Sequence, residues 1–365
     1  MPDMDLIFEE EALFLFFFLL WTYLAGFHPE AHGTEKFMDF GFMEAMMRST
    51  TLPAKDIWYG TDGINYYYGG QYYAVFLTKL SFTDVKQTYN LMRTLVAAFA
   101  FVLPFSICYQ MISSRILQRR REKKLSPVIG GLLSGAAVSL AGNMHYVVYG
   151  CIGKWLGWES AADYWFPDST RYIGYNPVVE NDKTIHEFPA YSFVLGDLHA
   201  HVVNVMFVLF VIGGVYAYVR RVQEENAGEG KWNAKEILLQ PHLILLAFFI
   251  GIFHWTNYWD FVIYFVVVCC GALYGALYRY RCKAKQVVSA VLVQAVEVFV
   301  IGTVAALPFT ISFETMVSGV ALAQRHSMLY QLAILWGLPV CLVVLFVAAV
   351  LLTWKRVEAP AGAET

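Results

Sequence analysis

A polar cluster directly before an apolar segment is the part of the chain best equipped for chemistry. Glu187, Asp197, His199 and His201 stand close together among aromatic residues, and a run of membrane-spanning length begins directly after them. Ionisable groups at the edge of a bilayer cost free energy to place, so a function is the first explanation for them. The segment 187–201 is therefore the first candidate site.

The motif Asp197-x-His199-x-His201 has the residue types of a divalent metal site. Neutral imidazole and carboxylate groups are ligands for transition metals, and in an extended segment alternate side chains share one face. Glu187 is a further carboxylate that can serve a metal or catalysis there. The alternative is structural, because Asp197 is favourable at a helix N-terminus and the histidines are wetted at the interface.

Two more carboxylates, Glu35 and Asp39, follow the first apolar run. A carboxylate whose pKa is raised by burial can act as general base on an acceptor hydroxyl. The segment 35–48 has helical spacing and predicts an amphipathic helix in the interface, with one apolar side made of Phe37, Phe40, Met43 and Met47. From spacing alone, a solvated face of this helix is the simpler explanation for both carboxylates.

Aromatic residues in the predicted loops are candidates for substrate binding. Their rings can stack on sugars or hold lipid headgroups, and an arginine can bind a phosphate with two parallel hydrogen bonds. The alternative is the Trp and Tyr belt that membrane proteins place at both interfaces, with the arginine as a loop contact. The candidates are Tyr66, Tyr67, Tyr68, Arg171, Trp255, Trp259 and Asp260.

The elements that must position these residues are transmembrane helices. The chain is 58% hydrophobic and only 15% charged, whereas soluble domains are about 25% charged. Several apolar runs approach the roughly 20 residues that cross a bilayer as a helix. We predict an all-α integral membrane protein with one membrane domain over 1–357, a polar cytoplasmic tail at 358–365, and about eight transmembrane helices, at 11–27, 91–113, 126–149, 201–219, 238–255, 260–279, 286–310 and 328–353.

The basic residues predict the orientation of these helices. Lys and Arg gather in the junctions after the second, fourth, sixth and eighth runs, and such junctions face the cytoplasm. Both termini are then cytoplasmic in a plasma-membrane protein, and the long loops 28–89 and 151–200 face outward. The acidic leader before residue 11 lacks the basic start of a signal peptide, so 11–27 is interpreted as an uncleaved span. The net charge of −3 indicates no partner, and no nucleic acid is expected.

Four stretches together resemble the YYY membrane protein family, a domain of unknown function in bacteria and archaea. They are Asn65-Tyr-Tyr-Tyr-Gly-Gly, Ile185-His-Glu-Phe-Pro, Ser192-Phe-Val-Leu-Gly-Asp-Leu-His-Ala-His201 and Tyr258-Trp-Asp-Phe261. Glu35-Lys-Phe-Met-Asp39 also resembles the family's stretch after the first span. The chain departs from the family at Ala200 and Val262, where proline is common, and family members are often longer.

That family is similar in layout to membrane glycosyltransferases of the GT-C type, which use lipid-phosphate-linked sugars. The resemblance implies a GT-C-like architecture, with an essential acidic residue just after the first span, where Asp39 stands. It implies transfer of a sugar from a polyprenyl-phosphate donor to a glycan or protein acceptor on the outer face. Asp39 would be the general base, aided by Glu35 and Glu187, and a divalent cation on Asp197, His199 and His201 is the candidate cofactor.

Two other function classes remain as alternatives. A transporter or flippase for a lipid-linked glycan would distribute ionisable residues through the midplane, where this chain has little besides Glu297. An outward-facing metal-dependent hydrolase would need a third firm ligand and an activated water, and no His-Glu-x-x-His motif is present. The enzyme interpretation is the leading one.

Overall fold

The computed structural model describes residues 4–119, 126–159, 164–225, 232–315 and 322–358, and every regular element within them is a helix. The contacts divide the chain into two compact units. Unit 1 is Met1–Leu140 with Ser192–Val317, and unit 2 is Ala141–Tyr191 with Ser318–Thr365. The single membrane domain and the tail at 358–365 stay predictions, and residues 359–365 lie outside the described part.

Five helices are long and apolar enough to cross a membrane: α4 (Val85–Arg119), α7 (Ala200–Glu224), α10 (Tyr258–Arg279), α11 (Ala284–Thr310) and α12 (Leu329–Glu358). An all-helical membrane protein with several spans is thus confirmed, whereas the count of eight is not. Two apolar helices are shorter, α5 (Pro127–Ser139) and α9 (Pro241–Thr256). The helix α1 (Met4–Ala25) carries Glu9, Glu10 and Glu11 in its N-terminal half.

The predicted span 126–149 is not one helix. Helix α5 ends at Ser139, and a π-helix, η1, begins at Tyr146 after an irregular stretch. In that stretch Asn143 accepts a hydrogen bond from the backbone N–H of His145 and donates one to the carbonyl of Ser169. An Asn side chain that bonds nearby backbone competes with helical hydrogen bonds, and the apolar pattern gave no sign of this.

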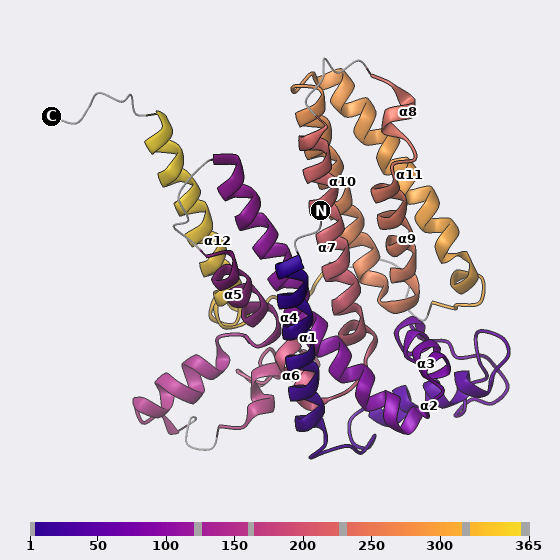
Figure 1. The fold of residues 1–365 in the computed structure, drawn as a ribbon. Helices are drawn as coiled ribbons and strands as arrows, with labels where there is room; N and C mark the ends of the chain where they lie inside the picture. The colour runs from indigo at the N-terminus through magenta and orange to yellow at the C-terminus, as the bar shows by residue number, and fades with distance from the viewer. Residues whose placement is uncertain (1–3, 120–125, 160–163, 226–231, 316–321, 359–365) are drawn as a thin grey trace. The chain divides into compact units, whose positions relative to one another are not determined.

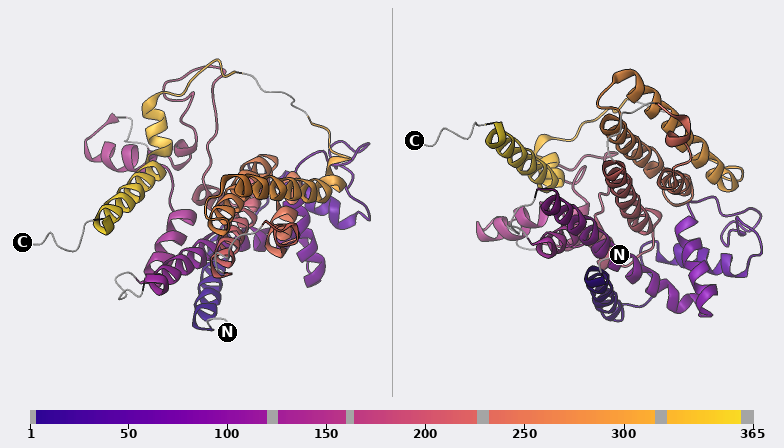
Figure 2. Two further views of the ribbon diagram at one scale, coloured as in Figure 1. Left: turned by 90° about the horizontal axis from the view of Figure 1, so that it is seen from above. Right: turned by 45° about the horizontal axis from the view of Figure 1, so that its top comes forward.

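In unit 1 the helices pack side by side. Helix α4 packs on α1, α5 and α7, and a second group is formed by α7, α9, α10 and α11 (Figures 1 and 2). The backbones of α9 and α11 approach closely, because a Cβ on Gly251 would lie 2.4 Å from the carbonyl oxygen of Gly302. Small residues allow this kind of contact between membrane helices.

The predicted loop 28–89 contains two helices, α2 (Lys36–Arg48) and α3 (Gly69–Ser81), and the start of α4. The helix predicted over 35–48 is therefore present, but its buried side differs from the prediction. Phe37 is 51% exposed, whereas Phe42, Met43 and Met46 are buried against the core of unit 1. The difference arises because α2 packs on α3 and α4, so protein contacts decide which of its sides is covered.

Two glycines at the start of α3 explain the Tyr-Tyr-Tyr-Gly-Gly motif. A Cβ on Gly69 would lie 2.7 Å from the Cβ of Trp255, and one on Gly70 would lie 2.8 Å from the side chain of Val203. The N-terminus of α3 thus contacts α9 and α7 at distances that leave no room for a side chain. This packing directs the next residue, Gln71, into the interior, where it is 0% exposed.

Unit 2 holds η1 (Tyr146–Gly153), the 3-10 helix η3 (Phe166–Thr170) and α12. Its loops are tied to α12 by backbone and side-chain hydrogen bonds. The backbone N–H of Met144 donates to the carbonyl of Ile334, and Gln331 donates to the carbonyl of Asn176. The orientation of the spans in the membrane and the outward-facing loops stay predictions.

Candidate functional site

Two helix N-termini meet in unit 1 and bring the candidate residues together. Glu35 is the N-cap residue of α2, and His199 is the N-cap residue of α7. Their side chains are in direct contact, with Nε2 of His199 bonded to Oε2 of Glu35. Residues separated by more than 160 positions in the sequence thus form one cluster, which also includes Asp39 and Asp197.

His199 lies between two carboxylates. Its other ring nitrogen, Nδ1, is 3.2 Å from Oδ2 of Asp197, an ion-pair distance at an angle that is poor for a hydrogen bond. Burial disfavours the charged ring, but the contact with Asp197 and the charges of Asp197 and Asp39 outweigh it and raise the pKa of His199 to about 10. The ring is therefore an imidazolium at neutral pH.

Asp39 is fully buried, and among the described residues only one of its two carboxylate oxygens has a hydrogen-bond partner. Its Oδ1 accepts a hydrogen bond of 2.8 Å from Nε2 of Gln71, while Oδ2 has no hydrogen-bond partner among the described residues. Burial raises the pKa of Asp39 to about 7, against the opposing effects of the His199 charge and the Gln71 hydrogen bond. The carboxyl group can therefore exchange a proton near neutral pH.

The turn before α7 presents Asp197 and His199 to this cluster. Helix α6 (Pro189–Leu195) ends there, and Gly196 follows with a φ of +75°, a conformation that favours glycine. Arg93 of α4 donates from Nη1 to the carbonyl of Gly196 at 3.0 Å. A Cβ on Gly196 would also lie 2.4 Å from this nitrogen, at the end of a flexible side chain, so the positive φ is the stronger reason for glycine at that position.

Asp197 is a second deeply buried carboxylate of the cluster. It is 1% exposed, and neither of its oxygens accepts a well-angled hydrogen bond from the described residues. Positive groups nearby offset its charge, since the electrostatic field of Asp197 acts on both His199 and Lys36. Burial, followed by the charge of Arg93, lowers the pKa of Lys36, which is itself 8% exposed.

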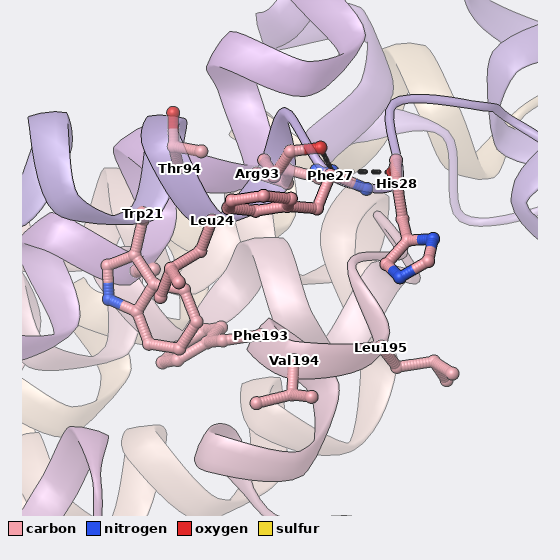
Figure 3. A pocket seen from close by; sticks show the side chains of 11 residues that line it. Trp21, Leu24, Phe27, His28, Arg93, Thr94, Phe193, Val194 and Leu195 are labelled. Carbon is pink, nitrogen blue, oxygen red and sulfur yellow. Dashed lines mark hydrogen bonds between the residues drawn. The ribbon is translucent and has the colours of Figure 1, made fainter.

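An apolar groove with a volume of about 340 Å³ lies beside this turn, and Arg93 lines it (Figure 3). Trp21 and Leu24 of α1 form part of its apolar lining, together with Phe193 and Val194 of α6. Arg93 stands at the end near His28, and its Nη2 donates to the carbonyls of Ala25 and His28. The groove thus has an apolar stretch and one guanidinium, which also contacts the turn before Asp197.

The aromatic candidates play different parts. Tyr66 lies close enough to the carboxylates that burial and the charges of Asp39 and Glu35 raise its pKa to about 12. Tyr67 stacks near Phe309 and Phe313, and Tyr68 is 2% exposed in the core. Trp255 packs against Tyr68 and Phe309. Trp259 is 72% exposed.

Asp260 joins α10 to α7. Its Oδ2 accepts hydrogen bonds from Asn204 at 2.5 Å and from Asn257 at 2.8 Å. Asn204 is fully buried and accepts a further bond from Thr256. This network fixes the turn between α9 and α10, which is a structural role for a residue that the sequence nominated for substrate binding.

Two predicted site residues belong to unit 2. Nη1 of Arg171 lies 3.4 Å from the hydroxyl of Tyr191, and Glu187 stands in the segment before α6. Their place in a site with Glu35, Asp39, Asp197 and His199 stays a prediction.

The metal assignment receives no support from the side-chain arrangement. Within the described ranges, no group of three or more His, Cys, Asp and Glu side chains is placed to hold a metal ion. His201 points to the exposed side of α7, with its ring centroid 5.7 Å from that of His199. The divalent cation therefore stays a prediction.

Three residues of the cluster were not among the sequence candidates: Lys36, Gln71 and Arg93. The position of each residue in the sequence gave a weak indication of a role in the site. Lys36 lies inside the motif Glu35-Lys-Phe-Met-Asp39, Gln71 directly follows Asn65-Tyr-Tyr-Tyr-Gly-Gly, and Arg93 is a charge inside an apolar run, which is costly in a membrane. Their roles depend on contacts with Asp197, Leu198 and Gly196, far away in the sequence.

Comparison with known proteins gives the family alone. A family model described as "Uncharacterized membrane protein (DUF2298)" matches residues 1–364. No curated protein and no solved structure matches the chain. An uncharacterised membrane protein family, expected from the motifs, is confirmed over the whole chain, whereas the YYY designation and the GT-C layout stay predictions.

Proposed function

We propose that this chain, which belongs to the uncharacterised membrane protein family DUF2298, transfers a sugar from a polyprenyl-phosphate donor to a hydroxyl acceptor with Asp39 as general base. The observation that carries the proposal is the state of the Asp39 carboxylate. One oxygen is fixed by Gln71, and the other is buried without a partner among the described residues. A fixed carboxylate with one unused oxygen is the arrangement that a general base needs.

The proposed reaction is a single displacement at the anomeric carbon of the sugar. Oδ2 of Asp39 takes the proton of the acceptor hydroxyl, and the acceptor oxygen forms a bond to the anomeric carbon. The bond from that carbon to the phosphate oxygen breaks, and polyprenyl phosphate leaves with the electron pair. The pKa of about 7 for Asp39 suits this step, because a base is most effective when its pKa lies near the working pH.

Positive groups beside Asp39 support the leaving phosphate in this proposal. The imidazolium of His199 lies beside Asp197, and the guanidinium of Arg93, from α4, donates to the carbonyl of Gly196 in the same turn. Fixed positive charges in a site that excludes water stabilise negative charge that develops in a transition state. The apolar groove lined by Arg93 has the chemistry to hold the first part of a lipid chain with its phosphate at the guanidinium.

Access to Asp39 requires a local opening. Asp39 is 0% exposed, whereas the side chain of Glu35 is 60% exposed and that of His199 is 15% exposed. The contact between Glu35 and His199 thus lies at the solvent edge of the cluster. An acceptor hydroxyl would reach Asp39 once the side chains of Glu35 and His199 move apart. Loop-like segments precede both helices, which makes their N-termini the parts most able to move.

A transfer assay with purified protein tests the proposal. A panel of polyprenyl-phosphate-linked monosaccharides is incubated with the protein and acceptor glycans, and release of polyprenyl phosphate is measured. Asp39→Asn should reduce the rate by about 10²-fold or more, because an amide cannot take the proton. Glu44→Gln, on the same helix but paired at the surface with Arg48, is the control and should keep the rate. Unchanged turnover in Asp39→Asn would remove the general-base assignment.

A further inference from the structure

A second groove lies toward the C-terminal end of α7, whereas His199 of the Asp39 cluster caps the N-terminus of that helix. Its volume is about 500 Å³, and it is lined by α4, α7 and the first turn of α9. On α7 it follows Gly213, Tyr216, Arg220 and Glu224. Spacings of three and four residues place these positions on one side of a helix, so the groove extends about 16 Å along α7 at 1.5 Å per residue.

The two ends of this groove differ in chemistry. At one end Gly213 faces Ile107 of α4, and both helices are candidate membrane spans. At the other end stand Arg220, Arg221 and His242, with Nη1 of Arg221 3.4 Å from Nδ1 of His242. Between them the hydroxyl of Tyr216 donates to the carbonyl of Gln110 and contacts Ser114 at 3.0 Å.

The arginines at the basic end are held by partners that a stronger anion can replace. Arg220 pairs with Glu224 at 3.0 Å, and Arg221 pairs with Glu225 at 2.8 Å. Both are i,i+4 pairs whose carboxylates are more than one-third exposed, and such exposed pairs contribute little to stability. Arg279 also contacts Glu225, so three arginines share two carboxylates there.

We propose that this groove binds an anionic phospholipid of the surrounding membrane. The phosphodiester would lie between Arg220, Arg221 and His242, since guanidinium groups bind phosphate with directed hydrogen bonds. The first part of an acyl chain would follow the groove between α4 and α7 toward Gly213. Basic pockets at the ends of membrane helices select anionic headgroups in this way. A free phosphate would fill only the basic end, whereas a lipid matches both ends.

Lipid titration of the delipidated full chain in a non-ionic detergent tests the proposal. Bound phosphatidylglycerol and phosphatidylcholine are counted by native mass spectrometry. Phosphatidylglycerol should bind about tenfold more tightly than phosphatidylcholine, and the double variant Arg220→Gln with Arg221→Gln should lose about this factor. Arg115→Gln is the matched control, because Arg115 is an exposed arginine near the same end of α4 and does not line the groove.

Two further variants separate this outcome from misfolding. Glu224→Gln removes the competing carboxylate and should strengthen phosphatidylglycerol binding. Gly213→Leu fills the apolar end and should weaken lipid binding, while its first carbon meets Ile107 at an ordinary 3.5 Å. Equal binding of both lipids, an equal loss in Arg115→Gln, or inorganic phosphate that competes as well as the lipid would each overturn the proposal. The last result would assign the groove to a soluble anion.

Discussion

Gln71 of α3 holds Asp39 of α2 through a hydrogen bond of 2.8 Å between Nε2 and Oδ1, and both side chains are fully buried. The same nitrogen donates to the carbonyl of Leu198 at 2.8 Å. One amide group therefore connects the carboxylate to the turn that carries Asp197 and His199. Burial of Gln71 depends in turn on the glycines before it, which allow α3 to contact α7 and α9.

Replacing Gln71 by leucine should raise the pKa of Asp39 further. The hydrogen bond favours the charged carboxylate, so its loss favours the protonated form. The acid limb of the pH–rate profile should move to higher pH, and the infrared band of the protonated carboxyl group should persist to higher pH. Gln87→Leu, at an exposed position of α4, is the control. A profile that does not move would mean that Gln71 does not set the charge of Asp39.

Residue types were enough to nominate Asp197 and His199, because charged groups next to apolar runs are costly. Asp39 was nominated by the resemblance to the YYY family and by its position after the first apolar run, since spacing alone favoured a solvated helix face for Glu35 and Asp39. Their meeting at two helix N-termini was not predictable, since it depends on contacts such as that of Arg93 with the carbonyl of Gly196. A backbone carbonyl has no signature in the sequence. Gln71 was missed for the same reason, because its second acceptor is the carbonyl of Leu198.

The helices followed the apolar runs, but their ends followed local hydrogen bonds and packing. The run 126–149 predicted one span, yet Asn143 bonds the nearby backbone and the α-helix stops at Ser139. Asp260 was nominated for substrate binding from its place in an aromatic turn. Its carboxylate instead accepts hydrogen bonds from Asn204 and Asn257, a network that only the packing of α10 on α7 reveals.

The protein should become less stable as the pH rises, because His199 then loses its proton and its stabilising effect. Its pKa is about 10 in the folded protein and about 6.5 in an unfolded chain. Its stabilising effect is therefore complete below about pH 6.5 and is lost as the pH rises toward 10. Melting temperatures of the detergent-solubilised protein should fall between about pH 8 and 10, above the pKa of about 7 for Asp39.

His199→Gln should remove this decline and lower the melting temperature at neutral pH, because Asp197 loses a positive neighbour. His201→Gln, two positions on and exposed, should keep the wild-type dependence. If both variants retain the decline, another group is responsible, and the assignment of the imidazolium to His199 is wrong.

Chelation of divalent metal ions should leave the protein unchanged at neutral pH. Both ring nitrogens of His199 face carboxylates, and its pKa of about 10 keeps the ring protonated, whereas a metal ligand must be a neutral imidazole. The melting temperature and the metal content are measured before and after treatment with a chelator. A fall that zinc or manganese reverses, and that Asp197→Asn abolishes, would restore the metal site predicted from the sequence.

Gly69→Ala should disturb the site from a position outside it. The added carbon would lie 2.8 Å from the carbonyl oxygen of Trp255 and 2.9 Å from its carbonyl carbon, atoms of a helix backbone that cannot yield easily. Such overpacking typically costs about 1–3 kcal/mol. If α3 moves away from α9 instead, Gln71 moves with it and the pKa of Asp39 rises as in Gln71→Leu. Gly60→Ala is the control, because the nearest atom to its added carbon is 4.0 Å away. Melting temperature and the infrared titration of the carboxyl group are measured on both variants, and a wild-type result in Gly69→Ala would show that the Tyr-Gly-Gly motif does not position Gln71.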